Sequence, residues 1–470
     1  MPVGDLAGEI ALVLGAVAVI VTSVVVPRRL QVAAAPLALV ACILSGVLIA
    51  RRMAGGAQAL TFMGAWSLDD VAAWAELIIL AVTGLTVVLS PEWMRGDARH
   101  GEWYAMVLFS AAGAMVMASA TDTLQLMVGV LLSSVTGYVL ASYHRRSALS
   151  VEAGMKYFLA GALANTVLLV GITVLFGVAG TTRYDETARV VAGGAPVAAL
   201  VAVVVLVAVG LAFKAGAVPV HTWVPDVAEG APAPAAAFLT VVPKVGGVVA
   251  LARIVTVLPD GVVGWRPLVA LLAAVTMTVG NLAALWQEDL RRLLGWSSVS
   301  QAGYALMAIP VVGRSDQALG ALVFFLAAYA VGQLAAFGVV TELRGRTRLD
   351  DYRGLAGRRP WLAAALVLAL LSMVGVPPLG GFVGKLLLFG ATVDGGYAWL
   401  AAVAVANTVV SLFYYLRVVA PLAFDPAPGP VPVLGRWATA ATALATAAVV
   451  GLGVGAEGLL DTLQGAQLLP

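Results

Sequence analysis

The sequence has few of the side chains that bind metals or redox groups. It contains one cysteine, Cys42, and three histidines that lie far apart along its 470 residues. A single thiol excludes cysteine-ligated iron–sulfur clusters and disulfide frameworks, and the histidines form no zinc motif such as HExxH. The chain also lacks the glycine-rich motifs that bind dinucleotides or nucleoside triphosphates. We therefore expect no metal site and no nucleotide site.

Charged residues are scarce as well. They make up 11% of the chain, whereas hydrophobic residues make up 61%. A soluble domain has about 25% charged residues, and no soluble fold could hide this much apolar surface. The composition predicts a polytopic membrane protein. The net charge of +2 indicates no particular partner.

Lysine is rare among the cations. Of the 27 basic residues, 23 are arginine and four are lysine: Lys156, Lys214, Lys244 and Lys385. The last three lie in apolar segments beside Gly/Pro-rich breaks. A lysine at membrane depth costs roughly 2.5 to 3.5 kcal/mol, so it usually marks an ion path, and a buried lysine can release its proton where arginine cannot. The alternative for Lys214 is that it extends from a helix end to the membrane surface.

Apolar runs of about 20 residues predict an all-α membrane fold with about 14 spanning helices. The expected spans are 9–26, 32–50, 71–89, 103–120, 123–143, 153–179, 195–216, 232–258, 265–286, 291–312, 317–342, 361–394, 397–423 and 434–455. The seventh runs into the Pro219–Pro234 region, and the twelfth is interrupted at 374–385. Two broken helices five positions apart indicate two inverted five-helix repeats, helices 4–8 and 9–13. Broken helices line cavities, because their free backbone groups need partners.

The expected organisation follows from these spans. It consists of peripheral helices 1–3 (1–102), the first repeat (103–258), the second repeat (259–423) and a C-terminal helix 14 (424–470). Fourteen arginines lie in odd-numbered loops and six in even-numbered loops. The positive-inside rule then places the odd loops in the cytoplasm of a bacterial cell. Both termini are expected on the outer, periplasmic side of its inner membrane.

Three stretches of the chain resemble a known family. They are PVHTWVPDVAEGAPAPAAAFLTVVPK at 219–244, DLRRLLGWSSVSQAGY at 289–304 and SMVGVPPLGGFVGKLLLF at 372–389. They are similar to the antiporter-like, proton-translocating membrane subunits of respiratory complex I, the NADH:quinone oxidoreductase. PDVAEGAPAP followed by the Pro–Lys pair at 243–244 resembles the N-type subunit.

The resemblance implies a function and a set of partners. It implies proton transfer along a hydrated axis, coupled to quinone reduction elsewhere in the complex, with no cofactor or redox centre in this chain. The implied partners are other membrane subunits and the lipid bilayer. NADH and quinone would be reached through other subunits, and no nucleic acid is involved.

The resemblance also assigns residues. The family's lysines of helices 7, 8 and 12 fall on Lys214, Lys244 and Lys385. Its glutamate of helix 5, which pairs with the helix 7 lysine, falls on Leu131. No acidic residue occurs between residues 122 and 152, so we expect Lys214 to be mostly neutral near neutral pH or to be held by another acid. The candidate acids are Glu76, Asp122, Asp226 and Glu229.

Two further residues are candidates for the proton relay. His221 lies at the first break and either exchanges protons or makes a structural hydrogen bond there. Glu76 lies inside the apolar run AAWAELIIL, and its alternative reading is a carboxylate that extends to the membrane surface. Ser298, Gln301 and Tyr304 are expected to hydrogen-bond water without holding charge.

Several functions remain open on the sequence alone. Multisubunit cation/proton antiporters and membrane-bound hydrogenases use homologous subunits. A scaffold subunit that no longer pumps is favoured by Leu131, and a stand-alone secondary transporter is the weakest alternative. The sequence does not separate proton from sodium transport.

Overall fold

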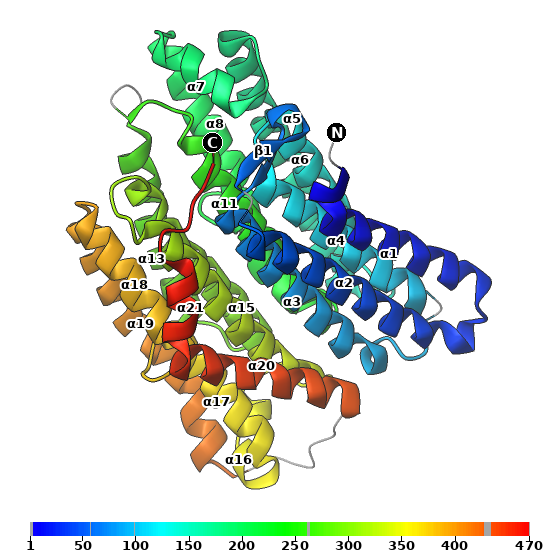
Figure 1. The fold of residues 1–470 in the computed structure, drawn as a ribbon. Helices are drawn as coiled ribbons and strands as arrows, with labels where there is room; N and C mark the ends of the chain where they lie inside the picture. The colour runs from blue at the N-terminus through cyan, green and yellow to red at the C-terminus, as the bar shows by residue number, and fades with distance from the viewer. Residues whose placement is uncertain (1–2, 57, 98, 261–263, 427–433, 470) are drawn as a thin grey trace.

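The computed structural model describes residues 3–56, 58–97, 99–260, 264–426 and 434–469, and it is built almost entirely of helices (Figure 1). The helices of the first half are α1 (Ala7–Val25), α2 (Ala34–Ala54), α3 (Asp70–Trp93), α4 (His100–Ser119), α5 (Thr123–Ala141), α6 (Ala148–Ala179), α7 (Tyr184–Ala192), α8 (Val197–Ala215), α9 (Trp223–Gly230), α10 (Ala233–Leu239) and α11 (Val242–Val255). Those of the second half are α13 (Trp265–Ala284), α14 (Leu290–Leu306), α15 (Ala318–Glu342), α16 (Leu355–Arg358), α17 (Pro360–Val374), α18 (Gly380–Asp394), α19 (Ala398–Phe424), α20 (Arg436–Val454) and α21 (Ala456–Leu463). One short antiparallel hairpin, β1 (Ala59–Thr61) with β2 (Trp66–Leu68), and five 3₁₀ turns complete the described elements.

The chain is an all-α polytopic membrane protein. Among the described residues, twelve helices are long and apolar enough to cross a membrane. Two of the fourteen expected spans do not meet that length. The tenth is α14, which has 17 residues, and the twelfth is divided into α17 and α18, with 15 residues each. The count of fourteen and the inverted repeats therefore stay predictions.

The two expected breaks are present. Helix α8 ends at Gly216, with φ of 72°, and α17 ends at Gly375, with φ of 98°. Glycine adopts this left-handed conformation without steric cost and so terminates both helices. A cis peptide bond precedes Pro219 and Pro378. Each break thus separates two helical segments where the sequence predicted an interruption.

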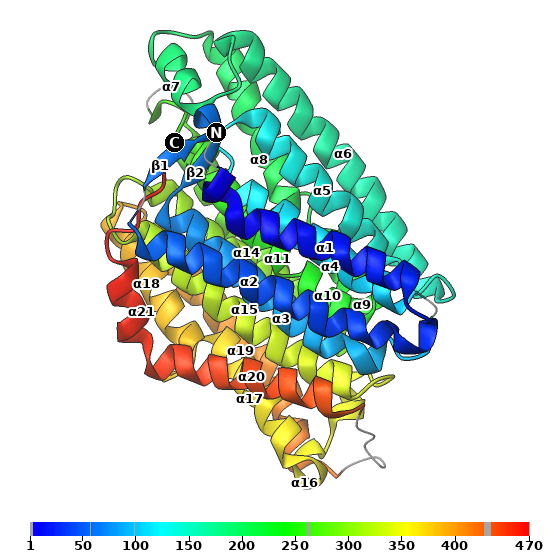
Figure 2. The same ribbon diagram turned by 45° about the vertical axis from the view of Figure 1, so that its right-hand side comes forward.

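The interior is formed by helices covered on all sides. The range Ala233–Val255, which contains α10 and α11, is buried inside the bundle, and α11 packs against α4, α8 and α3. Helix α15 is similarly enclosed and contacts α20, α18, α17 and α3 (Figures 1 and 2). In contrast, only a third or slightly more of the residues in the most apolar stretches of α1, α2, α6 and α20 are buried. These helices lie on the outer surface.

Glycines allow two helix pairs to approach closely. A Cβ on Gly113 of α4 would lie 2.5 Å from the backbone nitrogen of Ser133 on α5. A Cβ on Gly280 of α13 would collide with the backbone nitrogen of Ser300 on α14. Lipid tails are as apolar as leucine, so helices in a membrane associate through such close packing rather than through a hydrophobic force.

Both termini lie at the end of the molecule that carries the β1–β2 hairpin (Figures 1 and 2). The C-terminal segment runs along the start of α3, where the Val71 N–H donates to the Gln467 oxygen at 3.3 Å. The Leu469 N–H donates to the Asp69 carboxylate at 3.0 Å. Asp69 is also paired with Arg253 of α11 at 2.6 Å, and both side chains are fully buried. This ion pair joins the start of α3 to α11, and the C-terminal segment bonds the same carboxylate.

Replacing Arg253 with methionine should destabilise the protein strongly, because the Asp69 carboxylate would stay buried without its cation. Loss of one partner of a buried pair costs about 3 to 5 kcal/mol, and the thermal unfolding temperature of the purified protein measures the effect. The matched control is Arg189→Met, since Arg189 pairs with Asp185 while 72% exposed, and exposed pairs contribute about 0 to 1 kcal/mol. Equal unfolding temperatures for the two variants would contradict this prediction.

Candidate functional site

Lys214 lies at the end of α8, beside the first break. Its side chain is 1% exposed, and among the described residues its Nζ has no hydrogen-bond partner. The helix packs there against α11 at Gly247, where a Cβ would lie 2.6 Å from the Cβ of Lys214. Lys214 is thus enclosed by protein. The alternative that it extends to the membrane surface is wrong.

The acids expected to hold Lys214 are engaged elsewhere. Glu76 is paired with Arg52, Asp226 and Glu229 are paired with Arg292, and Asp122 accepts from backbone N–H groups at the start of α5. Leu131, to which the resemblance assigns the family's glutamate, is 43% exposed on the outer face of α5, whereas Lys214 is 1% exposed. Pairing with these four acids is therefore not observed. The neutral state of Lys214 stays a prediction.

Lys244 lies in the first turn of α11 and is 2% exposed. Its Nζ donates to Ser298 Oγ at 2.8 Å, to the Ser298 backbone oxygen and to the Tyr329 hydroxyl at 3.4 Å. It also lies 4.5 Å from the centre of the Tyr329 ring, where the face of an aromatic ring attracts a cation. All of these partners are neutral, so Lys244 is solvated by dipoles instead of being neutralised by a carboxylate.

Lys385 lies in α18, beyond the second break, and is 3% exposed. Its Nζ donates to the Val374 backbone oxygen at 2.9 Å and lies 4.2 Å from the centre of the Tyr304 ring. The Gln301 side chain donates to the neighbouring Met373 oxygen at 3.1 Å. The last carbonyls of a helix have no partner within it, so the break at the end of α17 supplies the acceptors that this lysine needs.

Helix α14 connects the surroundings of two lysines. Ser298 bonds Lys244, Tyr304 faces Lys385, and Gln301 lies between them on the helix. Positions 298, 301 and 304 recur every three residues and therefore lie near one another along the helix surface. The predicted hydrogen-bonding side chains thus link the two amines. Lys214 adjoins the same assembly through Gly247, one turn along α11 from Lys244.

His221 and Glu76 occupy different surroundings. His221 lies between α8 and α9, is partly exposed, and its ring centre is 5.5 Å from that of Trp296. Its Nδ1 has no hydrogen-bond partner among the described residues. Glu76 is fully buried among the first helices and bonded to Arg52 and Ser119, so the alternative that it extends to the membrane surface is wrong. A relay role for either residue stays a prediction.

Two arginines attach α14 to the broken segment. Arg291 is buried and donates to the Ala228 backbone oxygen at 2.9 Å, near the C-terminal end of α9. Arg292 pairs with Asp226 at 2.7 Å and with Glu229 at 2.6 Å. Two arginines of α14 thereby bind a backbone carbonyl and two carboxylates of α9. The position of the break relative to the lysines depends on these contacts.

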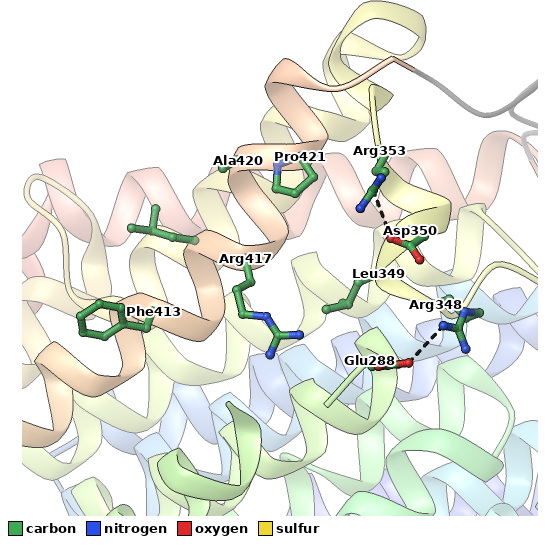
Figure 3. Close-up of a pocket in the computed structure, with 10 residues that line it drawn as sticks. Glu288, Arg348, Leu349, Asp350, Arg353, Phe413, Arg417, Ala420 and Pro421 are labelled. Atoms are coloured by element: carbon green, nitrogen blue, oxygen red, sulfur yellow. Dashed lines mark hydrogen bonds and ion pairs between the residues drawn. The ribbon is translucent and has the colours of Figure 1, made fainter. Parts of the chain in front are cut away.

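A surface hollow of about 560 Å³ lies away from the lysines (Figure 3). It is bounded by α19 and by the loops before α14 and α16, and its wall contains two exposed ion pairs, Arg348–Glu288 and Arg353–Asp350, each at 3.1 Å. Its lining includes none of the predicted relay residues. The candidate site is thus a buried series of amines and hydroxyls, not an open pocket.

Comparison with known proteins identifies relatives over the whole chain. Residues 120–411 match the family model for the transmembrane part of NADH:quinone oxidoreductase and Mrp antiporter subunits. The chain is 50% identical over 366 residues to NADH-quinone oxidoreductase subunit N of Mycobacterium sp. strain JLS, which covers 78% of this chain and 77% of that protein. It is 42% identical over 459 residues to subunit N 1 of Streptomyces griseus, covering 97% and 96%. A chain in the structure of respiratory complex I from Thermus thermophilus with bound aureothin superposes with a TM-score of 0.84 at 30% identity, covering 98% and 100%.

The chain belongs to this family. It is an antiporter-like membrane subunit, and the N-type resemblance, drawn from PDVAEGAPAP and the Pro–Lys pair at 243–244, is confirmed. The family model spans both breaks and all three buried lysines. The positions of Lys214, Lys244 and Lys385 are therefore inside the part of the chain that defines the family.

Several groups at this site were not predicted from the sequence. Tyr329 supplies both a ring face and a hydroxyl to Lys244, and Gln333, one turn further along α15, donates to Thr240 Oγ1 at 3.3 Å. A tyrosine and a glutamine four residues apart in an otherwise apolar helix could have indicated a polar site, because polar groups at membrane depth require partners. The contacts of Arg291 carried no such signal, since the arginine lies at a helix start in the sequence.

Replacing Gly247 with alanine should destabilise the protein and lower its activity, because the added methyl group would press on Lys214. Overpacking of this kind costs about 1 to 3 kcal/mol. Gly177→Ala is the matched control, since nothing lies within 4 Å of a Cβ at that position of α6. The thermal unfolding temperature and the activity should fall in Gly247→Ala and not in Gly177→Ala. Equal values for the two variants would show that α8 and α11 tolerate separation.

Proposed function

We propose that this chain is subunit N of a proton-pumping NADH:quinone oxidoreductase in a bacterial cell membrane. In this proposal it moves protons through Lys214, Lys244 and Lys385, while quinone reduction takes place in other subunits of the complex. The observation that carries the proposal is the burial of the three amines in one bundle without a carboxylate partner among the described residues.

The surroundings of each amine suit reversible protonation. A fully paired ion would hold its charge, since removing a proton from it leaves its partner uncompensated. Hydroxyls, carbonyls and ring faces stabilise an ammonium group and also remain hydrogen-bonded beside a neutral amine. Lys244 and Lys385 have such partners. A proton can therefore arrive or leave without breaking an ion pair.

Coupling between the lysines follows from the low polarity of their surroundings. Charges interact more strongly inside a protein than in water, so protonation of one amine changes the proton affinity of the next. Helix α14 bonds or faces two of the amines, and α11 carries one and packs on another. These helices support transfer in sequence, with water between the amines. His221 at the break and Glu76 are further candidates for this path.

The organisation that we propose has two inverted repeats, 103–258 and 259–423, between peripheral helices at 1–102 and a last helix at 424–470. The similar close packing of α4 with α5 and of α13 with α14 supports the repeats, as do the two glycine-terminated breaks. Both termini would face the periplasm. Other membrane subunits and lipid would cover the apolar outer helices.

A scaffold subunit that no longer pumps is the second candidate. It is favoured by Leu131, which lies on the outer face of α5, and by the absence of an acid beside Lys214 among the described residues. In that case the bundle would contribute assembly and sealing of the membrane. The two candidates differ in whether the remaining lysines affect proton stoichiometry.

Replacing Lys244 or Lys385 with methionine should lower the number of protons moved per electron, because methionine fills a similar volume but binds no proton. Proton uptake and quinone reduction by the complex in sealed vesicles measure this ratio. The matched control is Lys156→Met, since Lys156 is half exposed and paired with Glu152 at 2.7 Å. Assembly of all three variants is checked by the amount of intact complex recovered.

An unchanged ratio in both Lys244→Met and Lys385→Met, with normal assembly, would support the scaffold. A lowered ratio in these variants and an unchanged one in Lys156→Met would support the relay. Transport of sodium in place of protons would appear as a sodium-dependent ratio and would contradict the choice of ion.

A further inference from the structure

The first three membrane helices place two carboxylates on one guanidinium group. Glu9 of α1 and Glu76 of α3 accept from the two terminal nitrogens of Arg52 on α2, at 2.9 and 2.7 Å. These nitrogens are bonded to one carbon, so the two carboxyls lie close together on one guanidinium group. Glu76 is 0% exposed and Glu9 is 7% exposed. The cluster is therefore inside the protein.

The charges of this cluster do not balance if every group is ionised. Two carboxylates and one guanidinium leave one negative charge uncompensated, and a buried unpaired charge costs several kcal/mol. Among the residues that the structure describes, no second cation is bonded to either carboxyl. Helix α4 contributes the Ser119 hydroxyl, and the segment before α1 contributes the Asp5 backbone oxygen, which accepts from Arg52 at 2.7 Å. The Asp5 carboxylate accepts from a threonine hydroxyl and adds no positive charge.

Hydrogen bonding distinguishes the two carboxyls. Both oxygens of Glu76 have donors, because Oε2 accepts from Arg52 and Oε1 accepts from Ser119 at 2.6 Å. Glu9 Oε1 accepts from Arg52, but Glu9 Oε2 is buried and has no hydrogen-bond partner among the described residues. Oε2 of Glu9 is therefore the carboxyl oxygen that is free to hold a proton. Two carboxylates this close do not both ionise readily.

We propose that Glu9 and Glu76 form a proton-binding site in which the two carboxyls share one proton beside Arg52. The proton balances the cluster to zero net charge. Glu9 lies in the first turn of α1, at the end of the molecule that carries both termini, so exchange with water takes place from that surface. The site contains none of the three lysines of the proposed relay, and it holds its proton whether or not they conduct.

Infrared spectroscopy of the purified, assembled complex tests the shared proton. A protonated carboxyl has a C=O band that an ionised carboxylate lacks, and the difference spectrum between wild type and variant isolates it. Glu9→Gln should remove one such band, because the remaining Glu76 carboxylate then neutralises Arg52 unaided. Glu76→Gln should also remove one band, because Glu9 then takes over as the ionised partner.

The controls separate this site from general effects. Both glutamine variants keep side-chain size and a paired Arg52, so thermal unfolding should stay near that of the wild type. Glu102→Gln, at an exposed position in the first turn of α4, should leave the carboxyl bands unchanged. Lys244→Met should leave them unchanged as well, whatever it does to proton pumping.

Two results would overturn the proposal. The pair is ionised throughout if neither glutamine variant loses a protonated band. The two groups are protonated separately, without sharing, if each variant loses one band and the double variant Glu9→Gln/Glu76→Gln loses two. In the shared site, the double variant loses no more than either single variant.

Discussion

A charge buried in an apolar helix bundle must find its partner in the same bundle. Within the membrane, water does not compensate a misplaced ion, so each charged side chain depends on groups that the chain itself supplies. In this protein those groups are of two kinds. Arg253 meets the carboxylate of Asp69 with both side chains fully buried, whereas Lys244 and Lys385 meet hydroxyls, carbonyls and ring faces. The first kind fixes a charge, and the second is compatible with the reversible protonation that we propose.

The second kind of partner is made by interrupting helices. A continuous helix uses its own carbonyls, but α17 stops at a glycine and leaves those of Met373 and Val374 to accept from Gln301 and Lys385. At the first break, the Trp223 indole similarly donates to the Phe213 oxygen at 3.1 Å. The broken segments are then held by neighbours with ordinary ion pairs and buried hydrogen bonds, as Arg291 and Arg292 hold α9. The fold thus places neutral hydrogen-bonding groups beside the amines, and ion pairs and buried hydrogen bonds at α9.

The sequence was sufficient for the features that depend on one residue type or one local pattern. Apolar runs located the helices, the Gly/Pro clusters located both breaks, and the scarcity of lysine drew attention to the three amines now found buried. Pairing across the bundle could not be read in the same way. Each of the four acids expected near Lys214 bonds an arginine or the N–H groups of a helix start instead. Which cation pairs with which carboxylate depends on how separate helices pack together, as Arg52 of α2 pairs with Glu76 of α3. Sequence spacing does not contain that information.

The missing glutamate shows how the two kinds of partner interact. If a carboxylate pointed at Lys214, the pair would resemble Arg253–Asp69, and a moving proton would have to break an ion pair at low dielectric. Leu131 on the outer face of α5 supplies no such group, and Lys214 is left with close packing against Gly247. Any charge on Lys214 therefore depends on water or on its neighbours in the bundle, while Lys244 and Lys385 carry their own polar surroundings. In the proposed relay this makes Lys214 the position most sensitive to hydration, and the loss of an acid changes how a proton is held there without removing the amine that holds it.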